Sequence, residues 1–294
     1  MLVMQMTIQE LLDEALALHN AQRIVEAGVR YREILARDPD HPGALHLTGV
    51  IALQQQRFDK AIELIRRAIA VRPDSAAYHN NLGNALLAQD RREQAIASYR
   101  KAVELDGNFV DALTNLGSAL RVRGDLAEAK AVLDRATELA PENAAALNNL
   151  ANVLDMRGEG DRAIELYRRA LAINEYYPEA CRNLGRALFQ KKEYDEAIAW
   201  LRKAIAGEPD KAVAYVHLGL SLHELGANDE ALLNLQRAVE IEPDNAQLLG
   251  NYGIVLTECG RFDDAREIYR RAIAADPTSG VADCNLGVLS LKAG

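Results

Sequence analysis

The tripeptide Asn81-Leu82-Gly83 decides the fold of this chain, because a version of it returns every 34 residues. A fixed period of this length is typical of a solenoid built from helix–turn–helix units. All later copies but one begin with asparagine. The copies are Asn81-Leu82-Gly83, Asn115-Leu116-Gly117, Asn149-Leu150-Ala151, Asn183-Leu184-Gly185, His217-Leu218-Gly219, Asn251-Tyr252-Gly253 and Asn285-Leu286-Gly287.

Each repeat contains two apolar segments with helical spacing. In one repeat Tyr78, Leu82 and Leu86 recur on one helix face, and Ala95 and Tyr99 recur on a second. A short polar stretch separates the two segments. The sequence therefore predicts helical hairpins throughout. Eight complete repeats begin at Ile8, Pro42, Ala76, Val110, Ala144, Pro178, Ala212 and Ala246, and a half repeat covers residues 280–294.

Small residues at fixed phases predict how the helices pack. One phase of the second segment is alanine in all eight complete repeats, from Ala27 to Ala265. Glycine stands inside most first segments, where it costs up to ~1 kcal/mol relative to alanine. That repeated cost is explained if the two helices of a hairpin approach closely at the glycine. Another set of glycines lies at the turn, where it is predicted to accept the left-handed backbone that ends a helix: Gly124, Gly158, Gly226 and Gly260.

These features resemble the tetratricopeptide repeat (TPR) family. Its pattern places a small residue in the first helix, alanines around a large residue in the second, and a proline at the end. The match runs from about Ile8 to Gly294, although Gly107 and Glu175 replace the closing proline. The resemblance implies an all-α fold, an α-solenoid forming a right-handed TPR superhelix of eight helix–turn–helix repeats plus one extra helix.

We expect one solenoid over residues 1–294 without linkers, because no insertion breaks the period. Solenoids need capping units at their ends. The half repeat at 280–294 lacks its second helix, so we expect the chain to be a fragment of a longer protein.

Composition excludes several classes of partner. The formal net charge is −9 and the pI about 5.3, which argues against nucleic acid, because phosphate binding relies on Lys and Arg. No stretch approaches the ~20 apolar residues of a membrane span. The start lacks a basic region and a cleavage site, so a cytoplasmic location is expected. Three widely spaced cysteines, Cys181, Cys259 and Cys284, predict free thiols.

We find no pattern that predicts catalysis. The six histidines form no metal pair at helical spacing, and no cysteine lies beside them at ligand spacing. The glycines recur singly inside helices and form no phosphate-binding loop. We therefore expect no catalytic residue, no metal and no cofactor in this segment.

The recurring asparagines are polar where the fold does not require it. They lie one residue before a packing leucine, on the side that faces the groove of such a solenoid. An amide can pair with the N–H and C=O of any peptide. The alternative is that the asparagines hydrogen-bond between neighbouring repeats and hold the stack together. Six copies at one phase favour a peptide-binding role: Asn81, Asn115, Asn149, Asn183, Asn251 and Asn285.

Neighbouring positions would complete the groove. In the middle of the chain they are polar, and include Asn80, Asn84, Asn148, Asn152, Arg182 and Arg186; the two arginines predict a basic spot for a ligand carboxylate. Towards the C-terminus the same positions are apolar: Val213, Val216, Leu220, Ile254 and Val281. That apolar stretch fits either a peptide pocket or burial against a missing helix or partner subunit.

The asparagine series also resembles the repeat region of O-linked N-acetylglucosamine transferases, whose superhelix draws extended protein substrates to a catalytic domain. Asp13, Leu47 and His217 depart from the series. We therefore predict a non-catalytic module that binds an extended peptide or protein segment. Two alternatives stay open: a substrate-recruiting arm of a larger transferase, and a scaffold that self-assembles as a homo-oligomer through its uncapped C-terminal end.

Overall fold

A computed structural model gives the structure of residues 6–278 and 285–287. Within these ranges the chain forms α-helices and no β-strand, which confirms the all-α prediction. Its contacts divide the chain into two compact units, Met1–Pro141 and Glu142–Gly294. The single solenoid over residues 1–294 stays a prediction.

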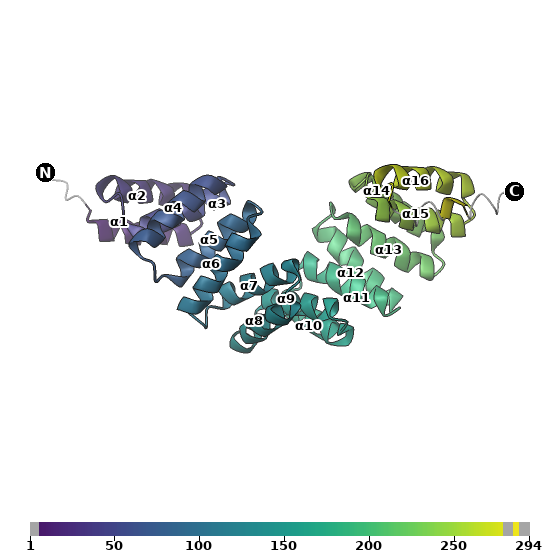
Figure 1. The fold of residues 1–294 in the computed structure, drawn as a ribbon, viewed down its shortest axis with the longest axis horizontal. Coiled ribbons are helices and arrows are strands. Elements are labelled where there is room, and N and C mark those ends of the chain that lie inside the picture. Colours follow the sequence, from purple (N-terminus) through teal and green to yellow (C-terminus); the bar gives the residue numbers. More distant parts are fainter. Residues whose placement is uncertain (1–5, 279–284, 288–294) are drawn as a thin grey trace. The chain divides into compact units, whose positions relative to one another are not determined.

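Unit 1 consists of four helical hairpins, drawn from purple to teal in Figure 1. The two helices of a hairpin pack against each other, and the second helix also packs against the first helix of the next hairpin. Its helices are α1 (Ile8–Asn20), α2 (Ile24–Arg37), α3 (Pro42–Gln54), α4 (Phe58–Val71), α5 (Ala76–Ala88), α6 (Arg92–Leu105), α7 (Val110–Arg123) and α8 (Leu126–Leu139).

Unit 2 repeats this arrangement with four more hairpins, from teal to yellow in Figure 1. Residues 285–287 are also helical, and the rest of the predicted half repeat at 280–294, with Val281 and Cys284, lies outside the described residues. Its helices are α9 (Ala144–Met156), α10 (Gly160–Ile173), α11 (Pro178–Gln190), α12 (Tyr194–Gly207), α13 (Ala212–Glu224), α14 (Asn228–Ile241), α15 (Ala246–Glu258) and α16 (Phe262–Ala275).

The first helix of every hairpin begins at the residue predicted from the period. The turn inside each hairpin is equally regular, because one residue per turn has a positive φ at a spacing of 34. Four of these residues are the predicted glycines, and the other four are not glycine. The eight are Gln22, Gln56, Asp90, Gly124, Gly158, Lys192, Gly226 and Gly260.

Alanine and glycine set the distance between paired helices, as predicted. All eight alanines from Ala27 to Ala265 are fully buried. In six hairpins the glycine of the first helix faces the large residue sixteen positions later, with no room for a β-carbon. For example, a Cβ on Gly219 would lie 2.8 Å from Leu235 Cγ and 3.0 Å from the carbonyl oxygen of Ala231.

We expect Gly219→Ala to lower the free energy of unfolding by about 1–3 kcal/mol, because overpacking against a backbone carbonyl outweighs the gain in helix propensity. Gly250→Ala on α15 is the matched control. Its Cβ would meet no atom within 4 Å, so we expect a gain of about 0.5–1 kcal/mol. Urea unfolding measures both, and equal effects of the two changes would contradict close packing at Gly219.

The helices have 13 or 14 residues each. None of those in the described ranges is long and apolar enough to cross a membrane.

Candidate functional site

The predicted site residues lie on first helices, which also contact one another from hairpin to hairpin. In unit 1, α3 contacts α5 and α5 contacts α7; in unit 2, α9, α11, α13 and α15 contact one another in series. We call the surface of these helices at the asparagine phase the inner face of each unit. Successive repeats therefore bring their asparagines next to one another on a single surface.

In unit 1 the inner-face asparagines are hydrogen-bonded to one another. Asn81 Nδ2 lies 2.8 Å from His46 Nε2. Asn115 Nδ2 donates to the side-chain oxygens of Asn80, at 3.0 Å, and of Asn84, at 3.3 Å. Asn84 in turn donates to Asn81 at 3.5 Å. These amides link α3 to α5 and α5 to α7, which is the inter-repeat role that the sequence left as an alternative.

Unit 2 contains the same arrangement once. Asn183 Nδ2 donates to Asn148 Oδ1 at 3.2 Å, and Asn148, which is fully buried, donates to Glu179 at 3.3 Å. Asn152 is only 7% exposed and accepts a hydrogen bond from the Tyr167 hydroxyl at 2.6 Å. The structure therefore places Asn152 in the packing between α9 and α10 rather than on an open surface.

The bonds made by Asn81, Asn115 and Asn183 follow one rule, because each spans 35 residues. In each case the partner lies in the preceding repeat, one residue before the position that corresponds to the asparagine itself. Two other predicted asparagines, Asn149 and Asn251, have no hydrogen-bond partner within the described ranges, so their amides can bind a ligand. Asn285 is partly buried, and most of its chain neighbours lie outside those ranges.

The predicted basic spot is neutralised within unit 2. Arg182 forms an ion pair with Glu208 at 2.5 Å, and Arg186 forms one with Asp155 at 2.5 Å. Asp155 is almost fully buried, with a side-chain exposure of 8%. Breaking this pair would leave a buried charge without its partner, which is costly. A ligand carboxylate would have to compete with these two acids.

A small cleft of about 140 Å³ opens on the inner face of unit 2, between α13 and α15. Val213, Val216 and Leu248 provide apolar walls, and Asn251 adds an amide that makes no hydrogen bond within the described residues. Val213 is 43% exposed, so the cleft is open to solvent. Part of the predicted apolar stretch thus forms a pocket in this structure.

His217, which interrupts the asparagine series, also lines this cleft. Burial, aided by the positive charge of Arg186, lowers the pKa of His217 to about 4, so the imidazole is neutral at pH 7. Its Nδ1 atom is buried without a hydrogen bond within the described residues. Its ring lies 5.6 Å from that of Phe189. The sequence showed His217 as a gap, whereas the structure makes it a wall of the cleft.

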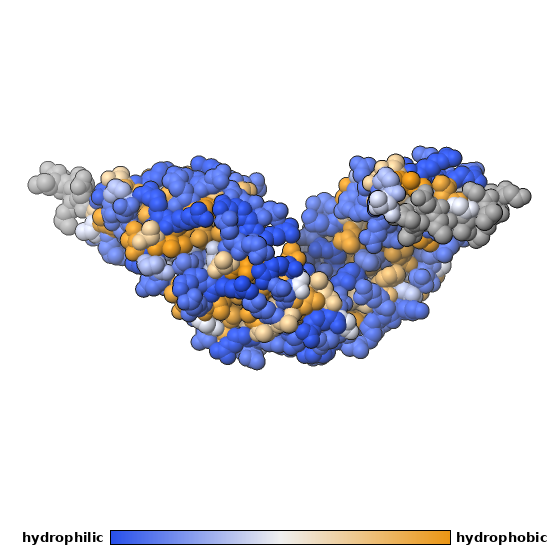
Figure 2. Space-filling model, viewed as in Figure 1, coloured by the Kyte–Doolittle hydropathy of each residue, from blue (hydrophilic) through white to orange (hydrophobic). Residues whose placement is uncertain are grey.

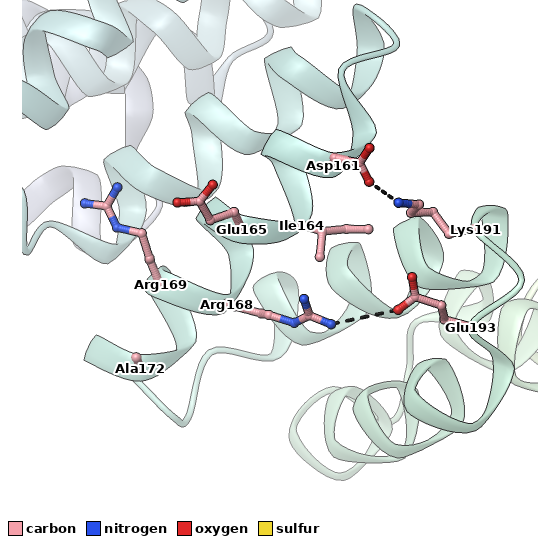
Figure 3. A pocket seen from close by; sticks show the side chains of 8 residues that line it. All are labelled: Asp161, Ile164, Glu165, Arg168, Arg169, Ala172, Lys191 and Glu193. Carbon is pink, nitrogen blue, oxygen red and sulfur yellow. Dashed lines mark hydrogen bonds and ion pairs between the residues drawn. The ribbon is translucent and has the colours of Figure 1, made fainter.

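A second groove lies on the side of the second helices, between α10 and the start of α12. Figure 3 shows two ion pairs among the residues that line it, Asp161 with Lys191 and Arg168 with Glu193. The Arg168–Glu193 pair has a separation of 3.9 Å. Arg168 also pairs with Glu196 at 2.8 Å. Because acidic and basic side chains pair with one another here, the groove does not attract a ligand of either charge.

The face seen in Figure 2 is mostly hydrophilic, with hydrophobic areas on both units. Such scattered apolar residues are normal on protein surfaces. They do not by themselves mark a binding site.

Comparisons with known proteins agree with this architecture. A family model described as a tetratricopeptide repeat matches residues 12–70, 49–108 and 114–178, and a second model with the same description matches residues 156–218 and 222–283. Together they account for most of the chain. The comparison with curated proteins returned no match.

Several solved structures share the fold. The APC/C hetero-tetramer Cut9-Hcn1 gives a TM-score of 0.75 at 18% identity, over 95% of this chain and 55% of that chain, so this chain spans about half the length of its counterpart. PilF of Pseudomonas aeruginosa gives 0.66 at 22% identity, covering 76% and 99% of the two chains. YrrB, described as a TPR protein with an unusual peptide-binding site, gives 0.50 at 28% identity, covering 64% and 97%.

Proposed function

This chain belongs to the tetratricopeptide repeat family, and on that premise we propose that it is a non-catalytic module that binds an extended segment of another protein on its inner face. The observation that carries the proposal is the cleft of unit 2, where apolar walls stand beside the free amide of Asn251. YrrB, a similar protein, is described as having a peptide-binding site.

The size of the cleft suits one side chain of a peptide. At about 140 Å³ it is well below the ~300–1,000 Å³ of pockets for small molecules. Burying an aliphatic side chain between Val213, Val216 and Leu248 would contribute about 1.5–3 kcal/mol. One hydrogen bond to Asn251 would add about 0.5–1.5 kcal/mol. The apolar anchor therefore supplies most of the affinity, and the amide fixes the position of the peptide backbone.

Unit 2 is favoured over unit 1 because its amides are less engaged. Asn81, Asn84 and Asn115 already bond within unit 1, so a peptide there must displace existing partners. An amide has two N–H donors and an oxygen acceptor, and the internal bonds use part of this capacity. We propose Asn149 and Asn251 as the primary amide contacts, and the other predicted asparagines as weaker ones.

A library of displayed random 16-residue peptides tests this proposal. Peptides enriched on the wild-type chain are synthesised, and their affinities for variants are measured by calorimetry. We expect Asn251→Ala to weaken binding ~3–10-fold, as the loss of one hydrogen bond requires. Val213→Glu, which places a charge in the mouth of the cleft, should weaken binding by at least ~10-fold.

Two matched controls lie on the exposed surface of α14. Gln236→Ala removes an amide there, and Leu233→Glu adds a charge at a residue that is 65% exposed. Both should bind like wild type. The proposal fails if no peptide is enriched, or if the enriched peptides bind the cleft variants as tightly as the controls.

The other two roles, a recruiting arm of a transferase resembling the O-linked N-acetylglucosamine transferases and a self-assembling scaffold, stay predictions. Neither gains support from a described residue. The end through which self-assembly was predicted falls largely within residues 279–294, most of which lie outside the described ranges.

A further inference from the structure

The loop between α10 and α11 differs from the other loops that join hairpins. Glu175 stands where most repeats have their closing proline, and Tyr176-Tyr177, the only pair of adjacent tyrosines in the sequence, follows it. Tyr176 is 88% exposed, more than any other exposed large hydrophobic residue of the described ranges. An aromatic ring held this far out in water contributes nothing to the core and is typical of a contact residue.

Beside this loop lies a cleft of about 330 Å³ that shares no lining residue with the inner-face cleft. One wall consists of the two tyrosines, Pro178 and the buried Cys181. The other is the end of α12, where Ala206 and Gly207 expose backbone and little side chain. The volume is that of a pocket for one large apolar group.

Two wall residues of this cleft, Tyr177 and Pro178, are held in place before any ligand arrives. The Tyr177 hydroxyl accepts a hydrogen bond from the fully buried Asn148 at 3.4 Å. Pro178 packs on Gly207 so closely that a β-carbon there would lie 3.1 Å from Pro178 Cβ. A preformed cleft loses little conformational entropy on binding, which favours affinity.

A cation stands at the rim. Lys203 Nζ lies 4.4 Å from the centroid of the Trp200 ring and 3.8 Å from a Glu175 carboxylate oxygen. It donates no hydrogen bond within the described residues, although an ammonium has three donors. The side chains of Lys203 and Glu175 are 52% and 72% exposed, so their ion pair is weak. The ammonium is therefore available to an anion of a bound partner.

We propose that this cleft is a second binding site, for a protein segment that inserts a large aromatic or aliphatic side chain and places an adjacent carboxylate on Lys203. The apolar walls take the side chain, Tyr176 folds its exposed ring over it, and the charge of Lys203 selects acidic neighbours. The site does not depend on the inner-face proposal, because it uses other residues of unit 2.

Fluorescein-labelled 12-residue peptides with a central Trp-Asp-Glu in a Gly/Ser sequence are the probe. Anisotropy titrations at low and high salt compare this peptide with Ala-Asp-Glu and Trp-Lys-Lys versions. We expect the Trp-Asp-Glu peptide to bind at least ~10-fold more tightly than either version, and the margin over Trp-Lys-Lys to shrink at high salt.

Variants separate this site from the inner face. Ala206→Phe fills the cleft from an exposed position and should lower the affinity for the Trp-Asp-Glu peptide at least ~10-fold. Ala70→Phe changes the equivalent exposed residue of α4, where Asp40 and His41 stand at the positions of the two tyrosines, and should bind like wild type. Lys203→Glu should reverse the preference in favour of Trp-Lys-Lys. Asn251→Ala should have no effect.

Thermal unfolding of each variant confirms that it is folded. The proposal is overturned if the Trp-Asp-Glu peptide does not bind at millimolar concentration, or if Ala206→Phe binds it as tightly as Ala70→Phe. Binding that is lost in Asn251→Ala and kept in Ala206→Phe would assign the peptide to the inner face and overturn the second site alone.

Discussion

Replacing Tyr99 by alanine is expected to lower the free energy of unfolding by about 3–5 kcal/mol, the range for deleting a buried aromatic side chain. Tyr99 is 1% exposed and fills the space beside Gly83, where a Cβ would lie 2.5 Å from its ring. Its hydroxyl also donates to Asn84 at 2.7 Å. Because a solenoid has no central core, the cavity cannot be filled by distant residues.

Two further variants separate the contributions to this loss, with urea unfolding as the measurement. Tyr99→Phe removes only the hydrogen bond to Asn84 and should cost about 0.5–1.5 kcal/mol. Gly83→Ala should be destabilising in the wild type and neutral or stabilising in the Tyr99→Ala background, because the ring that it strikes is gone. Additive effects of Gly83→Ala and Tyr99→Ala would show that the two residues do not share this space.

Acid is expected to destabilise unit 1 through His46. This side chain is 8% exposed and stacks on the Tyr78 ring with centroids 4.3 Å apart. Burial, with a smaller effect of the charge on His19, lowers the pKa of His46 to about 4, from 6.5. The Asn81 amide nitrogen lies against His46 Nε2. Protonation of Nε2 would therefore place two hydrogen-bond donors opposite each other.

The direction follows from the lowered pKa. Above pH 6.5 the imidazole is neutral in the folded and unfolded chain, and its contribution to stability is fully present. As the pH falls from 6.5 to 4 the unfolded chain takes up a proton and the folded chain does not, so stability falls by about 3 kcal/mol. Below pH 4 both forms are protonated and this loss stops growing.

Urea unfolding at pH 7.5, 5.5 and 4.0 tests the effect. Carboxylates also titrate in this range, so the informative quantity is the difference between wild type and His46→Gln. Between pH 7.5 and pH 4.0 we expect the free energy of unfolding of His46→Gln to fall by about 3 kcal/mol less than that of wild type. Parallel pH profiles would rule out the lowered pKa of His46. In unit 2, His217→Gln should behave in the same way, because the pKa of His217 is also about 4.

The helices could be predicted because the information is local and repeated. Pro42, Ala76 and Ala144 begin helices as the period required, and the glycine in most first helices indicated close packing of the paired helices. A single repeat would have been ambiguous. Eight copies average out individual departures, such as Glu175 in place of proline, and leave the register unambiguous.

The candidate site was predictable only in part. The sequence placed Asn80 at the groove, whereas it is 6% exposed and accepts from Asn115. That pairing depends on the rotation between neighbouring hairpins, which no sequence spacing within one helix reveals. The cleft beside Tyr176 and Tyr177 forms only because the end of α12 packs next to a loop about thirty residues earlier in the chain. Its signs in the sequence are the missing proline at Glu175 and the adjacent tyrosines that follow, and neither reveals which helix end packs beside the loop.

In unit 1 the hydrogen bonds that span 35 residues join the first helices of neighbouring hairpins, so they resist the separation of these helices. Under the proposed function, a peptide that binds the Asn115 amide would have to break its hydrogen bonds to α5, which would weaken the contact between α5 and α7. Linkage is reciprocal. Tension that pulls these two helices apart would therefore raise the affinity for such a peptide, and compression would release it. If peptides bind as proposed, the asparagines would couple the separation of neighbouring hairpins to peptide affinity.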